Sequence, residues 1–170
     1  ERARADGAEF VIAPELFLCG YPPRDLLLRP DFVEANLATL ADTAKGIGAV
    51  PLGVGYVDKS ATRPGRSLTN SVAVLQNGKV IWHQYKSLLP TYDVFDEDRY
   101  FEPATENTPV EINGRRLGLT ICGDVWNDED LLRVFAGPGK RLRGECAASV
   151  LQRHRTRLRR MVARHTGKHE

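Results

Sequence analysis

Two Asn-Gly dipeptides constrain the fold of this chain more than any other feature of its sequence. Asn77-Gly78 lies between the segments TNSVAVLQ and KVIWHQY, and Asn113-Gly114 lies between VEI and RRLGLTIC. Asn-Gly accepts the left-handed backbone that a two-residue β-hairpin turn requires, and runs rich in β-branched residues favour strands. The sequence therefore predicts two β-hairpins.

Further strands and helices are expected around the hairpins. Residues 9–14 form a short apolar run that ends at Pro14, and VPLGVGYV over residues 50–57 predicts another strand. Apolar residues recur at helical spacing over residues 32–47, with Asp31 as the expected N-cap, and a second helix is expected from Asn127 or Asp128 to Phe135. Strands in hairpins with helices between strands predict two-layer α/β packing.

Three polar residues each follow an apolar run: Glu15 after EFVIAP, Lys86 after VIWHQY and Cys122 after LGLTI. A thiolate can attack an amide carbon, a carboxylate can move protons, and an ammonium group can stabilise the oxyanion. Each residue also has an ordinary interpretation, namely a strand-end carboxylate in water, a solvated lysine and a buried core cysteine. The three residues by themselves leave both interpretations open.

The segments around these residues resemble the carbon–nitrogen hydrolase (nitrilase) superfamily. GYPPRDLL and LPTYDVFDEDRYF are most similar to the glutaminase domains of glutamine-dependent NAD synthetases, and the resemblance covers residues 5–135. It implies an α/β fold, a partial α-β-β-α sandwich in which two sheets pack face to face. It also implies that Glu15 is the general base, Lys86 the oxyanion partner and Cys122 the nucleophile.

The same resemblance implies further substrate-site residues in the loop that follows Lys86. Tyr92 would contact the polar end of the substrate, and Glu97 would support the catalytic lysine, although ordinary loop polarity explains both residues equally well. The family usually has Glu directly after the nucleophile, where this chain has Gly123. A missing carboxylate there predicts weaker binding of glutamine.

The implied activity is hydrolysis of glutamine through a Cys thioester, which supplies ammonia for NAD biosynthesis. The sequence holds no phosphate-binding or dinucleotide-binding glycine motif, so no cofactor is expected in this segment, and ATP and deamido-NAD would belong to a synthetase domain that is absent from this chain. The family also implies a homo-oligomer. The alternatives are a stand-alone nitrilase-type amidase, a non-catalytic fragment and a nucleic-acid-binding module that acts through a basic tail.

Charge divides the chain near residue 137. Residues 1–136 carry 14 Lys+Arg and 20 Asp+Glu, whereas residues 137–170 carry 10 Lys+Arg and 2 Asp+Glu. The division predicts a partial carbon–nitrogen hydrolase (glutaminase) domain over 1–136 and a disordered or helical basic tail over 137–170. The tail is either out of frame or a real basic helix. Because the tail has no counterpart in the family and ERARADGA reads as the end of a helix already under way, we expect a truncated domain with impaired activity.

The remaining composition places the chain among cytoplasmic proteins. Cys19, Cys122 and Cys146 show neither zinc spacing nor an even disulfide set, which favours a reducing compartment. No apolar run is long enough to span a membrane, so we expect no membrane partner. No metal site is expected either, because the three histidines of the tail lack further ligands at suitable spacing.

Overall fold

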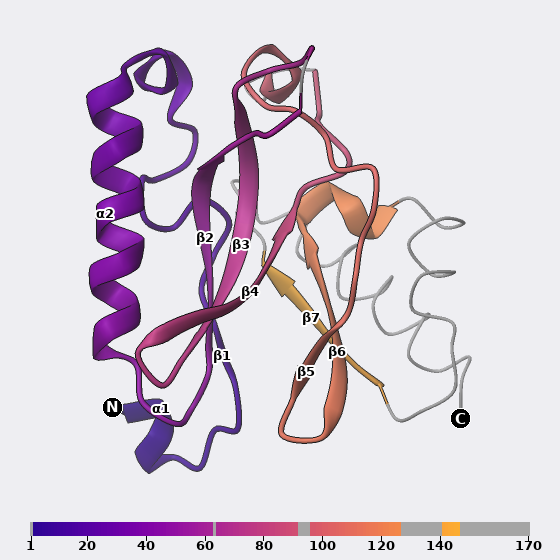
Figure 1. Cartoon of the computed structure of the whole chain (residues 1–170). Helices are drawn as coiled ribbons and strands as arrows, with labels where there is room; N and C mark the ends of the chain where they lie inside the picture. The colour runs from indigo at the N-terminus through magenta and orange to yellow at the C-terminus, as the bar shows by residue number, and fades with distance from the viewer. Residues whose placement is uncertain (1, 63, 92–95, 127–140, 147–170) are drawn as a thin grey trace.

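Two β-sheets pack face to face, and a long helix covers the outer face of the first sheet (Figure 1). The computed structural model describes residues 2–62, 64–91, 96–126 and 141–146. The first sheet has the order β1-β2-β3-β4, with β1 at Val11–Ile12, β2 at Leu52–Lys59, β3 at Leu68–Gln76 and β4 at Lys79–Tyr85. The second sheet has the order β5-β6-β7, with β5 at Val110–Ile112, β6 at Arg115–Ile121 and β7 at Arg141–Cys146.

The α-helices are α1 at Arg2–Ala5 and α2 at Pro30–Gly46. Short 3₁₀ helices lie in the connections, η1 at Arg24–Leu28 before α2, η2 at Glu97–Arg99 before β5 and η3 at Cys122–Trp126 after β6. Helix α2 lies in the crossover between the parallel strands β1 and β2. Together these elements form the α-β-β part of the predicted sandwich. In the part of the chain that the structure describes, no helix is both long and apolar enough to cross a membrane.

Both predicted hairpins are confirmed. Asn77 and Gly78 have φ angles of 49° and 79°, and Asn113 and Gly114 have φ angles of 52° and 72°. Each dipeptide joins an antiparallel pair, β3 with β4 and β5 with β6. Two consecutive left-handed residues are the requirement of a type I′ turn, whose twist matches that of the paired strands.

Helix α2 begins earlier than the sequence predicts. Its N-cap is Arg29, which makes no side-chain capping bond, and Pro30 occupies the first turn. The expected cap, Asp31, lies inside this first turn and accepts hydrogen bonds from the Arg29 guanidinium. The prediction of Asp31 as the N-cap is wrong because Pro30 already has the φ angle of a helix and starts it two residues sooner.

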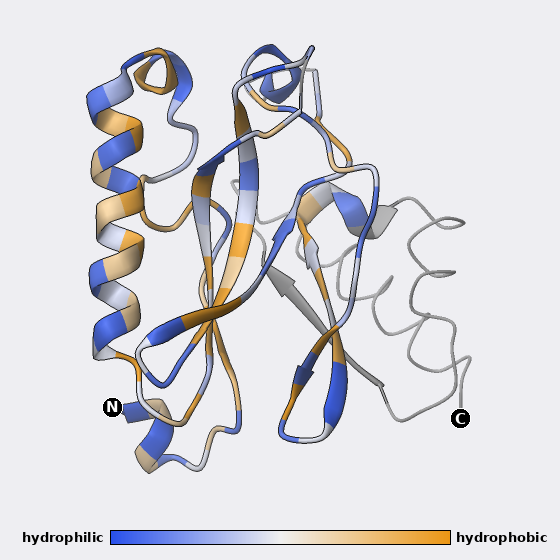
Figure 2. Ribbon diagram, in the orientation of Figure 1, coloured by the Kyte–Doolittle hydropathy of each residue, from blue (hydrophilic) through white to orange (hydrophobic). Residues whose placement is uncertain are grey.

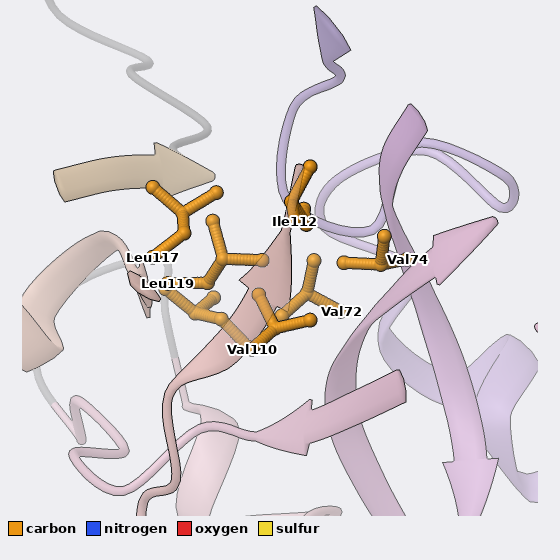
Figure 3. Close-up of a cluster of buried hydrophobic side chains, with 7 residues drawn as sticks. Val72, Val74, Val110, Ile112, Leu117 and Leu119 are labelled. Atoms are coloured by element: carbon orange, nitrogen blue, oxygen red, sulfur yellow. The ribbon is translucent and has the colours of Figure 1, made fainter. Parts of the chain in front are cut away.

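Strand β3 is buried on both faces. Its Val72 and Val74 face the second sheet and belong to the cluster of Figure 3, formed by Val72, Val74, Val110, Ile112, Leu117, Leu119 and Ile121. Ala73 and Leu75 face the other way and pack with Leu40, Ala44, Val54 and Tyr56 beneath α2. Figure 2 shows that the first half of β3 is more polar than the apolar second half. The polar half marks the end of the sandwich where the candidate site lies.

The basic tail contains a strand. Residues Arg141–Cys146 form β7, which pairs in parallel with β6 from Arg116↔Arg141 to Ile121↔Cys146. The prediction of a disordered or helical tail is therefore wrong for these residues, since strand pairing uses backbone groups that basic residues also carry. The other residues of the tail, and the helix predicted up to Phe135, lie outside the described residues.

Candidate active site

Glu15 reaches the site because β2 lets the chain pass very close. A Cβ atom added to Gly55 would lie 2.4 Å from the Leu16 nitrogen and 2.5 Å from the Pro14 carbonyl oxygen. The Leu18 N–H also donates to the Gly55 carbonyl oxygen at 3.1 Å. The segment after β1 therefore lies directly on β2, and the Glu15 side chain is buried beneath it, with 2% of the residue exposed.

Lys86 lies directly after β4, where its backbone N–H donates to the Asn70 carbonyl oxygen at 2.8 Å. Its Nζ donates to Glu15 Oε1 at 2.7 Å and to both carboxylate oxygens of Glu97 at 2.8 and 2.9 Å. Lys86 and Glu97 are 1% and 2% exposed. One buried ammonium group thus bridges two buried carboxylates.

Asn70 and Tyr21 complete this buried cluster, and sequence reasoning missed both. The Asn70 amide donates to Glu15 Oε1 at 2.7 Å and to Glu97 Oε2 at 3.3 Å, and the Tyr21 hydroxyl donates to Glu97 Oε1 at 2.9 Å. Glu15 Oε2 and Asn70 Oδ1 are buried without a hydrogen-bond partner in the described part of the chain. The available signal for Asn70 was three successive polar residues, 69–71, in an otherwise apolar strand.

Burial and mutual charge set the protonation of the cluster. Burial lowers the pKa of Lys86, but the charges of Glu15 and Glu97 outweigh this effect, so the pKa rises above its usual value and the ammonium form persists. Burial raises the pKa of Glu97, although Lys86 opposes that change. Burial also raises the pKa of the Tyr21 phenol, with further increases from Glu97 and Glu15. The Tyr21 phenol therefore stays protonated and donates its hydrogen bond to Glu97.

Cys122 borders the cluster from the second sheet. It directly follows β6, is half-buried and has a φ of 46°, in the left-handed region that non-glycine residues rarely adopt. Burial lowers the pKa of Lys86, and the charges of Glu15 and Glu97, followed by that of the Cys122 thiolate, raise it. The thiolate charge also adds to the raised pKa of Tyr21, after burial and the two glutamates. The sulfur therefore lies within electrostatic reach of the ammonium group.

Asp124 is a buried carboxylate that the sequence interpretation did not single out. It is 2% exposed and accepts hydrogen bonds from the backbone N–H groups of Ser87, Leu88 and Ile121 at 2.9, 2.8 and 3.2 Å. Burial raises its pKa to about 6, against the opposing effect of these hydrogen bonds. The signal in the sequence was an aspartate at a strand end, where its side chain can bind backbone amides.

A cavity of about 270 Å³ adjoins the cluster on the side of Tyr21 and Glu97. Leu16, Leu27 and Phe101 form its apolar wall. Of the site residues predicted from the sequence, the structure brings Glu15, Lys86 and Glu97 into direct contact and places Cys122 at their border. Tyr92 lies outside the described residues.

Known proteins match most of this chain. The sequence profile of the carbon–nitrogen hydrolase family matches residues 1–142. The glutamine-dependent NAD(+) synthetase of Synechocystis sp. is 44% identical over 132 residues, which are 75% of this chain and 24% of that protein. The enzyme of the same name from Thermotoga maritima is 37% identical over 147 residues, covering 84% of this chain and 24% of that protein.

Solved structures agree with this similarity. The glutamine-dependent NAD+ synthetase from Acinetobacter baumannii superposes with a TM-score of 0.76 at 29% identity, covering 92% of this chain and 29% of that one. An amidase from Nesterenkonia sp. shares the fold, with a TM-score of 0.71 at 24% identity over 91% of this chain and 59% of its own. The chain spans about a quarter of the length of the curated relatives it matches.

Proposed function

This chain belongs to the carbon–nitrogen hydrolase family, and we propose that it is the glutaminase part of a glutamine-dependent NAD synthetase. Its identity to the synthetase of Synechocystis sp. supports glutamine as the substrate. The observation that carries the chemistry is the Lys86 ammonium group, which is buried between Glu15 and Glu97 and feels the charge of Cys122, a cysteine on left-handed backbone.

The proposed reaction begins with the transfer of the Cys122 thiol proton to Glu15. Glu15 Oε1 already accepts hydrogen bonds from Lys86 and Asn70, so Oε2 is the oxygen that can take this proton. The thiolate then attacks the side-chain amide carbon of glutamine, and the Lys86 ammonium group stabilises the oxyanion that forms on the carbonyl oxygen.

The second half of the proposed reaction releases ammonia and restores the thiol. The C–N bond breaks as the nitrogen takes the proton from Glu15, which leaves a thioester at Cys122. Glu15 then removes a proton from water, the hydroxide attacks the thioester, and glutamate leaves as the sulfur regains its proton. Asn70 and Glu97 keep Glu15 and Lys86 in place through both steps.

The proposal extends to the reaction that uses the ammonia. ATP and deamido-NAD are assigned to the parts of the relatives that this chain does not cover, and homo-oligomers are expected, as the resemblance implies. We also propose a cytoplasmic setting, because the nucleophile must stay a reduced thiol.

The test is ammonia release from L-glutamine by the full chain and by two cysteine variants. Cys122→Ala should lower the rate by at least about 10³-fold, because it removes the nucleophile. Cys19→Ala should retain most of the rate, because burial raises the pKa of the Cys19 thiol to about 11 and leaves it protonated at neutral pH. Equal losses in both variants would contradict the assignment of Cys122. Hydrolysis of acetamide without hydrolysis of glutamine would instead identify a simple amidase.

A further inference from the structure

A buried carboxylate outside the cluster links the segment that carries Lys86 to the segment that carries Cys122. Asp124 Oδ1 accepts the N–H groups of Ser87 and Leu88, the two residues that directly follow Lys86. Its other oxygen, Oδ2, accepts the N–H of Ile121, the residue that directly precedes Cys122. The Asp124 side chain therefore binds the backbone just after Lys86 and just before Cys122.

The two segments belong to different sheets. Lys86 follows β4 of the first sheet, whereas Cys122 follows β6 of the second sheet. Their backbones nevertheless approach closely, because a Cβ added to Gly123 would lie 3.9 Å from the Leu88 carbonyl oxygen. Asp124 makes its hydrogen bonds in this region, to Ser87 and Leu88 of one segment and to Ile121 of the other.

We propose that Asp124 is a positioning residue that fixes the distance between the Lys86 ammonium group and the Cys122 thiol, an inference that rests on the proposed function. A carboxylate suits this task because both of its oxygens accept hydrogen bonds, whereas an asparagine side chain has one accepting oxygen and one donating nitrogen. The single accepting oxygen of an asparagine side chain cannot replace the two carboxylate oxygens that accept the three N–H groups. Its hydrogen bonds from Ser87, Leu88 and Ile121 all come from backbone N–H groups, so it acts through the backbone.

A purely structural role explains this residue less well. Burial raises the pKa of Asp124 to about 6, so ionisation of the carboxylate near neutral pH lowers the stability of the fold relative to the protonated form. The charged group that faces it is Lys86, whose attraction only partly offsets the burial. A buried carboxylate whose ionisation costs stability and that binds three backbone amides is expected where position matters more than stability.

The experiment compares Asp124→Asn with the matched control Glu111→Gln, an exposed carboxylate on β5, in the full chain. We expect Asp124→Asn to lower kcat for glutamine about 10–100-fold with little change in KM, since small displacements of reacting groups have effects of this size. Hydrogen exchange should speed up at the amides of Ser87, Leu88 and Ile121. Glu111→Gln should change none of these values.

A second variant tests the same proposal if Asp124→Asn does not fold. Asp124→Glu keeps the charge but moves the carboxylate by one methylene group, so it should also lose kcat while KM stays near the wild-type value. A folded Asp124→Asn or Asp124→Glu variant with wild-type kcat would overturn the proposal.

A readout that does not need glutamine separates this proposal from the proposed function. The rate of Cys122 alkylation by iodoacetamide is followed against pH by peptide mass spectrometry, and Asp124→Asn should shift this profile to higher pH because Lys86 is no longer held beside the sulfur. If the wild type hydrolyses no glutamine but the profile shifts, the positioning role stands and the glutaminase assignment falls. If glutamine is hydrolysed and neither kcat nor the profile changes, the positioning role falls alone.

Discussion

Among single residues, Lys86 has the largest expected effect on stability. Its ammonium group is the hydrogen-bonded counter-ion of two buried carboxylates, so Lys86→Met should leave uncompensated charge in the interior. Breaking a buried ion pair from one side costs about 3–5 kcal/mol. Urea unfolding at pH 7 should show this loss, whereas Lys79→Met, at an exposed position of β4, should change the free energy of unfolding by less than about 0.5 kcal/mol.

A double variant checks the cause of that loss. Adding Glu97→Gln to Lys86→Met removes one of the two carboxylates, so part of the lost stability should return. Two outcomes would show that the charges of the cluster do not determine the stability of the fold. Either Lys86→Met lowers the free energy of unfolding no more than Lys79→Met does, or adding Glu97→Gln lowers it further.

The residues of the site differ in how far the sequence could reveal them. Glu15, Lys86 and Cys122 each follow an apolar run, and this pattern is visible locally. Asn70 binds Glu15 and Glu97, which are 55 and 27 residues away, and Asp124 binds the backbone N–H groups of Ser87 and Leu88, 37 and 36 residues away. The local sequence does not identify these partners. A buried polar residue inside a strand is informative only once the fold shows what it faces.

At the scale of elements, β2 lies so close to the segment that carries Glu15 that position 55 should not accept a side chain. Gly55→Ala would place a Cβ within 2.4–2.8 Å of backbone atoms of residues 14–16, and backbone cannot move aside as a flexible side chain can. We expect a loss of at least about 1–3 kcal/mol in the free energy of unfolding, together with a large loss of kcat as Glu15 shifts.

The matched control for this change is Gly46→Ala at the end of α2. Nothing lies within 4 Å of a Cβ at this position, and alanine favours helices over glycine by about 1 kcal/mol. Gly46→Ala should therefore be neutral or stabilising with unchanged kcat. If Gly55→Ala and Gly46→Ala have equal free energies of unfolding in urea, the contact between Gly55 and residues 14–16 is not as close as the structure shows.

Elements with local determinants were predictable and those with distant determinants were not. The two hairpins followed from their Asn-Gly turns, because a turn type depends on the φ angles of two adjacent residues. Strand β7 was missed because its basic composition gives no apolar pattern, and its pairing depends on the backbone of β6. Helix α2 was predicted from its spacing, and only its first turn was misplaced.

For the whole molecule, the raised pKa of Asp124 predicts a distinct dependence of stability on pH. The folded state binds this proton more tightly than the unfolded state, whose ordinary pKa is 3.8. The contribution of Asp124 to stability is therefore fully present below pH 3.8 and is lost as the pH rises through about 6. By linkage, the loss is on the order of 3 kcal/mol.

Urea unfolding of the wild type and of Asp124→Asn at several pH values between 4 and 7 measures this contribution. Because asparagine does not titrate, the free energy of unfolding of the wild type should fall relative to that of the variant as the pH rises over this range. A difference that is flat or that rises with pH would show that burial does not dominate the environment of Asp124.

The cluster around Lys86 also has a consequence for the order in which the chain folds. Lys86 is 11 residues from Glu97 but 71 residues from Glu15, and Glu15 reaches it only after the crossover through α2 has brought β1 beside β2. Contacts across longer loops form later because closing the loop costs more entropy. We therefore expect Glu15 to be the last charged member to arrive. A nascent or partly unfolded chain then has no Glu15 base close to the Cys122 thiol, so the thiol stays poorly reactive until folding is complete.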